Sequence, residues 1–219
     1  MKITSIYEKY GLMDSLCTHM LNVAGLTCYL LEKLDLRSED DLTYIKGALL
    51  HDIGKMVSFK IGLIPGSLAG HTHDYWTAKQ NNLKKQYGID PETATKNILD
   101  ELNVNEDVRH VATTIGFIFG KRVLDSGNMQ HMVACYSDQR ISPFGIAPLT
   151  YRMQEGRIHF RANNNIIDEG NEELVKWEKY SNAFILMEKL LFAKSTLNPD
   201  HITDKDLVYY IELVAELEL

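Results

Sequence analysis

The sequence predicts a mainly α-helical fold, and three observations lead to that prediction. Apolar residues recur at helical spacing along most of the 219 residues. Short stretches rich in Gly, Pro, Asn and Asp, the residues that cap and break helices, separate these periodic segments. The clearest strand-like alternation, TYRMQEGRIHFRA at residues 150–162, surrounds a glycine. We therefore expect a helical bundle with a short β-hairpin near the C-terminal third of the chain.

Length, composition and charge limit the class of protein. With 45% hydrophobic and 24% charged residues, the chain fits one globular domain over residues 1–219. The net charge of −7 and the lack of a long basic run disfavour duplex nucleic acid and membrane surfaces as partners. Three isolated cysteines, and no apolar run of signal-peptide or membrane-spanning length, favour the cytoplasm.

The first strong pattern predicts a helix over residues 14–34. Its apolar positions are Leu16, Met20, Val23, Ala24, Leu30 and Leu31. His19 falls on the same face, so we expect it to point to the core rather than to water. A single histidine on an apolar face is more often a packed core residue than a metal ligand, and this alternative stays open.

A second helix is predicted over residues 40–53, and it ends in the sequence HDIGK. Leu42, Ile45 and Leu49 give the helical spacing, and Gly54 is expected to be a left-handed C-cap. His51 and Asp52 are then adjacent in the last turn, about 100° apart around the helix axis. A metal ion beyond the helix end could be approached by both side chains. The alternative is a capped surface helix with two unrelated polar residues.

A stretch without helical periodicity follows, residues 56–71, which we interpret either as a substrate lid or as a plain connection. His71 and His73 lie at its end, and Asp74 is expected to cap a helix that runs to residue 87. Further helices are predicted over residues 91–102, where Pro91 occupies the first turn, and over residues 106–119, with His110.

The last predicted helix of this first part covers residues 125–141 and carries Asp138 near its end. A carboxylate there needs a cationic partner if it is partly buried. Beyond it, residues 142–170 contain the expected hairpin, whose Arg152, Arg157, Arg161 and His159 could line a phosphate pocket or form a solvated strand face. Two final helices are predicted over residues 171–192 and 204–219. The last one could pack on its own core or on a second subunit, so a homodimer remains an option.

Read in order, His19, His51-Asp52 and Asp138 form the pattern H…HD…D on separate helices. The stretch HDIGK at residues 51–55 carries the resemblance, supported by LCTHMLNVAGL around His19 and VACYSDQRIS around Asp138. The chain resembles the HD-domain superfamily of metal-dependent phosphohydrolases over about residues 12–141. The resemblance implies an HD-type helical core there, with residues 142–219 packed on it.

The resemblance also implies roles for individual residues. His19, His51, Asp52 and Asp138 match the ligands of the family's primary metal, and Asp52 would bridge to a second ion. His73 and His110 fall where two-metal members have further ligands, with His71 as the alternative to His73. Lys55 matches the position that contacts a substrate phosphate, and we expect Arg140 and Arg152 to assist it. The cofactor is then one or two divalent ions of Mn, Fe, Ni, Co or Zn.

The implied activity is hydrolysis of a phosphomonoester or phosphodiester of a small metabolite, with a nucleotide favoured. Asp52 and Lys55 would be the catalytic residues, acting with a metal-activated water. Residues 64–67 read IPGS instead of the GYP signature of the cyclic-dinucleotide phosphodiesterases, which disfavours that subgroup. Lys55 also replaces the glutamate of the 5′-deoxynucleotidase-like members. The alternatives are a di-iron oxygenase of the same fold and a non-catalytic scaffold that binds a ligand or partner.

Overall fold

A computed structural model describes residues 1–62 and 68–219 of the chain. In this part it contains eleven α-helices, three short 3₁₀ helices and one two-stranded antiparallel hairpin, which confirms the predicted fold class. The IPGS stretch and the middle of the expected lid at residues 56–71 lie outside the described residues. Among the helices described, none combines the length and the apolar character needed to cross a membrane.

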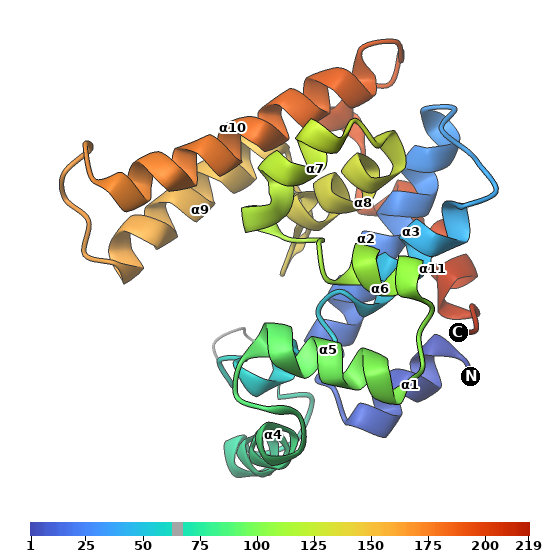
Figure 1. The fold of residues 1–219 in the computed structure, drawn as a ribbon, viewed down its shortest axis with the longest axis vertical. Helices are drawn as coiled ribbons and strands as arrows, with labels where there is room; N and C mark the ends of the chain where they lie inside the picture. Colours follow the sequence, from blue (N-terminus) through green and yellow to red (C-terminus); the bar gives the residue numbers. More distant parts are fainter. Residues whose placement is uncertain (63–67) are drawn as a thin grey trace.

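The chain runs through a helical body and then through a pair of long helices that project from it (Figure 1). The body contains α1 (Ile3–Tyr10), α2 (Asp14–Lys33), α3 (Asp41–Leu50), η1 (Lys55–Val57), α4 (His73–Tyr87), α5 (Pro91–Glu101), α6 (Glu106–Ala112), η2 (Phe117–Phe119), α7 (Gly120–Ser126) and α8 (Met129–Arg140). The rest contains β1 (Ile141–Ser142), β2 (Gly145–Ile146), α9 (Leu149–Asn163), α10 (Glu172–Phe192), η3 (Pro199–His201) and α11 (Asp204–Ala215).

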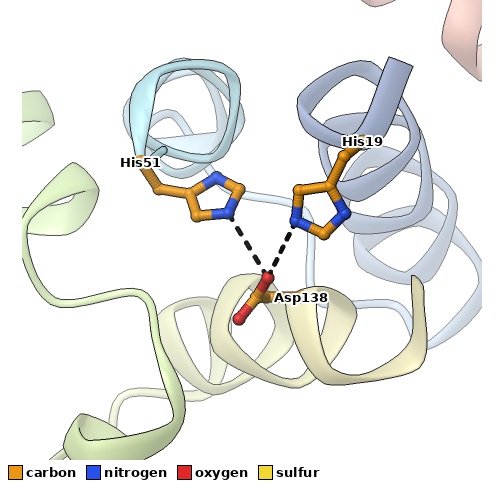
Figure 2. Close-up of side chains that lie close together, drawn as sticks. All are labelled: His19, His51 and Asp138. Carbon is orange, nitrogen blue, oxygen red and sulfur yellow. Dashed lines mark hydrogen bonds and ion pairs between the residues drawn. The ribbon is translucent and has the colours of Figure 1, made fainter. Parts of the chain in front are cut away.

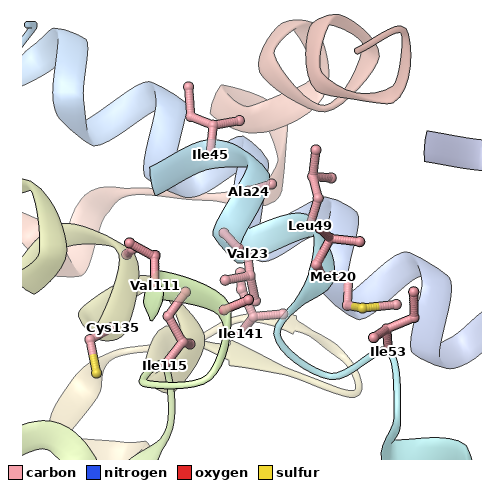
Figure 3. Close-up of a cluster of buried hydrophobic side chains, with 14 of the residues drawn as sticks. Met20, Val23, Ala24, Ile45, Leu49, Ile53, Val111, Ile115, Cys135 and Ile141 are labelled. Carbon is pink, nitrogen blue, oxygen red and sulfur yellow. The ribbon is translucent and has the colours of Figure 1, made fainter. Parts of the chain in front are cut away.

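Helix α2 lies at the centre of the body. Every residue from Val23 to Leu31 is buried, as expected for a helix that is covered on all sides. It packs against α3, α8 and α11. Apolar side chains from these helices and from α6 meet in a common core (Figure 3), whose labelled members are Met20, Val23, Ala24, Ile45, Leu49, Ile53, Val111, Ile115, Cys135 and Ile141. This core fixes α2, α3 and α8, the three elements next to the histidines and the aspartate identified above.

Helices α9 and α10 form an antiparallel pair, called here the arm (Leu149–Phe192), that extends beyond the body (Figure 1). The prediction of a short hairpin is confirmed, but its place was wrong. Ile141–Ser142 pairs with Gly145–Ile146, while residues 150–162 form most of helix α9. Its inward positions Met153, Gly156 and Phe160 follow helical spacing, and the Phe160 ring packs on Trp177 of α10. The packing of residues 150–162 against α10 therefore determines their helical structure, in spite of the alternating sequence pattern.

Three predicted helices have different bounds in the structure. The helix expected at residues 106–119 ends at Ala112, and Gly116 adopts a φ of +150° before η2. The helix expected at 125–141 is split into α7 and α8, and the Asn128 side chain caps α8 by accepting the His131 N–H. Thr72, rather than Asp74, caps α4, so His73 is the first residue of that helix.

The turn after α3 differs from the prediction in a way that matters for the site. Helix α3 ends at Leu50, so His51 and Asp52 lie in the turn that follows. Gly54 is not left-handed; its φ and ψ are −85° and −6°. A Cβ atom at position 54 would lie 2.3 Å from the backbone N of Thr95, and the Gly54 N–H donates to Thr95 Oγ1 at 3.2 Å. The glycine is required because α5 packs directly against this turn.

A Gly54→Ala substitution should therefore destabilise the fold by about 1–3 kcal/mol, the usual cost of forcing extra volume into a packed contact. The free energy of unfolding in urea measures this loss. Gly170→Ala is the matched control, because Gly170 is exposed in the loop of the arm and has no close contact there. Equal unfolding free energies for the two variants would contradict this explanation of Gly54.

Candidate metal centre

Three side chains from separate segments of the chain converge in the body of the protein (Figure 2). His19 comes from α2, His51 from the turn after α3, and Asp138 from α8. His19 Nε2 lies 3.2 Å and His51 Nε2 lies 3.3 Å from Asp138 Oδ1. One ligand atom from each residue lies within 4.8 Å of the other two. We call this group the His19–His51–Asp138 cluster.

A hydrogen bond on the side away from the cluster fixes the orientation of the His51 ring. Its Nδ1–H donates to the carbonyl oxygen of Ala48 at 2.7 Å, so Nε2 is the atom that faces the cluster. The side chain is 2% exposed, and Nε2 has no hydrogen-bond partner with acceptable geometry among the described residues. A buried polar atom without a partner costs about 1–3 kcal/mol. One ring nitrogen of His51 is held by a hydrogen bond, and the other is directed at atoms that can also coordinate a metal. This is the arrangement of a metal-ligating histidine.

Asp138 is held in a similar way. Its Oδ2 accepts a hydrogen bond from the Gln139 side chain at 2.6 Å, while Oδ1 faces both imidazoles. Burial alone raises the pKa of Asp138, but the neighbouring imidazoles of His19 and His51 outweigh it and hold the pKa well below its usual range. The carboxylate is therefore ionised. Two imidazoles and one carboxylate form a donor set that suits Mn, Fe, Co, Ni or Zn.

Without a metal, His51 carries a proton at neutral pH. Burial lowers its pKa, but the carboxylates of Asp52 and Asp138 outweigh burial and raise the pKa to about 9. A metal ion binds only the neutral imidazole, so it has to displace this proton.

Binding of Mn²⁺ at pH 7 should therefore release close to one proton per cluster. Below the raised pKa of His51, about 9, the proton competes with the metal. The apparent affinity should accordingly fall about tenfold for each pH unit below that value and level off above it. Titration calorimetry in two buffers of different ionisation enthalpy measures the protons released. An affinity that stays constant between pH 6 and pH 8 would contradict the protonated His51.

Asp52 and Lys55 lie beside the cluster. Asp52 Oδ2 is 3.9 Å from His51 Nε2, and Asp52 Oδ1 is 3.9 Å from the Lys55 ammonium. The Asp52 side chain is partly exposed and the Lys55 side chain is half exposed. Asp52 therefore lies between His51 of the cluster and the Lys55 ammonium.

A cavity of about 650 Å³, called here the main cavity, opens next to these residues. Its lining includes His51, Asp52 and Asp138, and its volume is typical of small-molecule sites. Lys55 from the turn, Lys96 from α5 and Arg122 from α7 add three cationic side chains to the lining. The same lining contains the carboxylates of Asp52, Glu92 and Asp138, so the three cations do not exceed the anions, but they offer contacts to an anionic ligand.

The predicted ligands of a second metal are not part of the cluster. His110 is exposed and lines the main cavity, with its ring 5.8 Å from that of His131. His73 is exposed at the start of α4, with Nδ1 3.2 Å from Thr77 Oγ1. His71 stacks on Tyr75 at 4.1 Å. Among the described residues, only His110 of these three faces the cavity.

The structure contradicts the predicted role of Arg140 in substrate binding, and it places Arg152 outside the main cavity. The Arg140 side chain is 1% exposed and donates to the Tyr136 hydroxyl and to the carbonyl oxygens of Ala147 and Pro199. This geometry contradicts a substrate contact, because the guanidinium is directed into the protein. Arg152 forms an ion pair with Glu155 and lines a second, smaller cavity instead of the main one.

Sequence reasoning missed four residues at the site. Lys96 and Arg122 reach the main cavity only because α5 and α7 pack near the turn after α3, and their sequence neighbourhoods carry no signal of this. His131 is buried beneath His110 and lies 3.0 Å from Thr114 Oγ1; burial and the nearby His110 lower its pKa to about 4. Gln139 follows Asp138 directly, and that adjacency is the one local signal that could have identified a supporting residue.

The comparison with protein families gives one match. The HD domain model matches residues 16–112, which span α2 to α6 and include His19, His51, Asp52 and Lys55. Asp138 lies beyond the matched segment, on α8, and reaches the two histidines through the tertiary structure. Searches among curated proteins and among solved structures gave no match. Residues 16–112 therefore match an HD domain, in agreement with the resemblance to the HD-domain superfamily that the sequence motifs indicate.

Proposed function

We propose that this protein is a metal-dependent phosphohydrolase that cleaves a phosphomonoester or phosphodiester of a small metabolite, with a nucleotide favoured. The observation that carries the proposal is the buried His51 Nε2. It points at Asp138 Oδ1 without hydrogen-bond geometry, and it lies at the wall of a cavity that also contains the Lys55 ammonium. A purely structural His–Asp pair would normally be closed by a hydrogen bond.

The residues that would hold the ion are His19, His51 and Asp138, with Asp52 as the next ligand and as the bridge to a second ion. His110 is the remaining candidate for that second ion, because it lines the same cavity. A bound divalent ion supplies Lewis acidity and lowers the pKa of a coordinated water towards neutrality.

The other groups of the cavity bind and orient the substrate. Lys55 places a positive charge beside Asp52, where it can hold a phosphoryl oxygen as negative charge develops on it. Lys96 and Arg122 add charge farther along the cavity lining and attract an anionic substrate. The Asp52 carboxylate would accept a hydrogen bond from the attacking water and orient that water towards the phosphorus.

The test is hydrolysis of nucleoside mono-, di- and cyclic phosphates and of p-nitrophenyl phosphate, after loading with Mn²⁺ or Fe²⁺. Phosphate release reports on the mono- and diphosphates, formation of the nucleoside monophosphate on the cyclic phosphates, and p-nitrophenol on the last compound. Lys55→Ala should lower kcat/KM by on the order of a hundredfold, because a positioned cation at the developing charge is lost. Lys85→Ala on α4 is the matched control, since Lys85 is exposed and is not in the described cavity lining.

Metal-loaded, folded protein that hydrolyses no compound of the panel would contradict the proposal. Iron binding together with oxygen consumption, in place of phosphate release, would identify the oxygenase alternative. Metal binding without turnover of either kind would identify a ligand-binding scaffold.

A further inference from the structure

A second cavity of about 250 Å³ lies at the base of the arm and adjoins the main cavity. Phe117 and Gln139 line both cavities. The rest of the second lining comes from the arm, chiefly from Gly156 and His159 on α9 and from Trp177 on α10. We call this the arm cavity. Two residues therefore belong to the walls of both cavities, which places the arm cavity directly beside the main cavity.

Hydrogen bonds connect the arm cavity to the His19–His51–Asp138 cluster. The Gln139 side chain donates to Asp138 Oδ2 at 2.6 Å, and the Gln139 carbonyl oxygen accepts from Arg152 Nε at 3.3 Å. Arg152 lines the arm cavity. The arm cavity therefore begins at the residue next to a proposed metal ligand. If a phosphorylated molecule binds with its phosphoryl group at the cluster, the rest of that molecule can reach the arm cavity.

The chemistry of the arm cavity suits a flat ring with a polar edge. Phe117 and Trp177 form an aromatic wall, with ring centroids 5.1 Å apart and planes inclined by 32°. Arg152, Glu155 and His159 supply donors and acceptors around it. A flat aromatic wall stacks with rings, and a few polar groups fix their orientation. The volume of about 250 Å³ lies below the range of roughly 300–1,000 Å³ for a complete ligand, so the cavity would take one ring system of a larger molecule.

Gly156 lets α9 pack closely against Trp177 at the edge of this cavity. It lies in the interior of α9, where glycine is less favourable than alanine by roughly 0.5–1 kcal/mol. Its backbone does not require glycine, because its φ is not positive. A Cβ atom there would lie 3.3 Å from Trp177 Cζ2, closer than an ordinary contact, so a methyl group would press on the ring that lines the cavity.

We propose that the arm cavity is a binding subsite for an aromatic heterocycle of the nucleobase type. The substrate then lies with its phosphoryl group at the cluster and its base in the arm cavity, against the wall that Phe117 and Trp177 form. The position of the phosphoryl group rests on the proposed function. The binding of the base does not, because the arm cavity contains none of the proposed metal ligands.

The subsite can be tested by tryptophan fluorescence without metal and without turnover. The chain has two tryptophans, Trp76 and Trp177, so a Trp76→Phe protein reports on Trp177 alone. Titration with adenosine and with guanosine should change this signal saturably for at least one of them. Inorganic phosphate and ribose should not change it. Absence of any saturable change with both nucleosides, in protein that retains its helical circular dichroism, would overturn the proposal.

Gly156→Ala in the same background locates the site. It should weaken nucleoside binding by about tenfold, because the added methyl group fills space next to Trp177. Gly170→Ala, the same replacement in the exposed loop of the arm, should leave binding unchanged. His159→Ala provides a second variant with an exposed side chain, expected to weaken binding severalfold. Unchanged binding in both Gly156→Ala and His159→Ala would place the nucleoside elsewhere and overturn the proposal.

Turnover separates this inference from the proposed function. Gly156→Ala should raise KM for a nucleotide substrate, whereas Gly170→Ala should leave that KM unchanged. Hydrolysis of simple phosphoesters without nucleoside binding would overturn the subsite and support the hydrolase. Nucleoside binding that responds to Gly156→Ala, without hydrolysis of any phosphoester, would support the subsite and contradict the hydrolase.

Discussion

An Asp138→Ala variant should bind no transition metal at the His19–His51–Asp138 cluster and should lose phosphoester turnover by on the order of a thousandfold, the upper range for loss of one preorganised electrostatic group. Asp138 Oδ1 lies within 3.3 Å of both imidazoles, so it is the group that joins the donors of α2 and of the turn after α3. Elemental analysis after Mn²⁺ or Fe²⁺ loading measures the bound metal, and phosphate release measures turnover.

Asp138→Asn separates loss of the metal from loss of the fold. The amide has the shape of the carboxylate and can still accept a hydrogen bond from His19, but it lacks the negative charge that an ion requires. We expect near-native helical circular dichroism together with the same loss of metal. Asp125→Ala is the matched control, since Asp125 is exposed and pairs only with Lys121 among the described residues. Full metal stoichiometry in Asp138→Ala would rule out the proposed centre.

The parts of the fold that could be predicted are those with strong local signals. Helix α2 follows the predicted bounds within one residue because its apolar pattern is long, and α5 begins at Pro91 as expected from the preference of proline for the first turn. Residues 150–162 were mispredicted because an alternating pattern around Gly156 resembles a hairpin. The close contact between α9 and Trp177 that explains this glycine is a tertiary feature, and the local sequence does not indicate it.

The same distinction applies to the candidate site. The order of His19, His51 and Asp138 could be read from the chain, because HDIGK at residues 51–55 and the stretches around His19 and Asp138 carry the family resemblance. Gly54 was correctly singled out, but for the wrong reason: the close approach of Thr95 requires it, not a left-handed conformation. Arg140, two residues after Asp138, was expected to assist Lys55 at the substrate. A side chain two positions along a helix points about 200° away, and here it points into the protein.

Two parts of the chain form the cluster and the arm cavity. The matched HD segment and α8 provide the cluster, while the arm provides the second cavity. Asp138, Gln139 and Arg140 lie at the junction, at the end of α8. Asp138 faces the histidines, Gln139 lines both cavities, and Arg140 binds the segments that follow. The position of the arm relative to the cluster therefore depends on the contacts of Arg140.

Replacing Arg140 by alanine should consequently lower the free energy of unfolding by about 3–5 kcal/mol, the range for breaking a buried charge network. The guanidinium joins α8 to the carbonyl oxygens of Ala147 and Pro199 and lies 3.9 Å from Glu188 of α10. Its removal leaves these buried acceptors unpaired and opens a cavity between α8, the hairpin and η3. Urea unfolding followed by circular dichroism measures the loss.

Arg152→Ala is the matched control, because the Arg152–Glu155 ion pair is partly exposed and such pairs contribute about 0–1 kcal/mol. Arg140→Lys keeps the charge but not the planar fork that reaches several acceptors at once, so an intermediate loss is expected. The opposite outcome is equally specific. An Arg140→Ala protein with wild-type unfolding free energy and a raised KM for a phosphorylated substrate would return Arg140 to the substrate-binding role that its buried geometry contradicts.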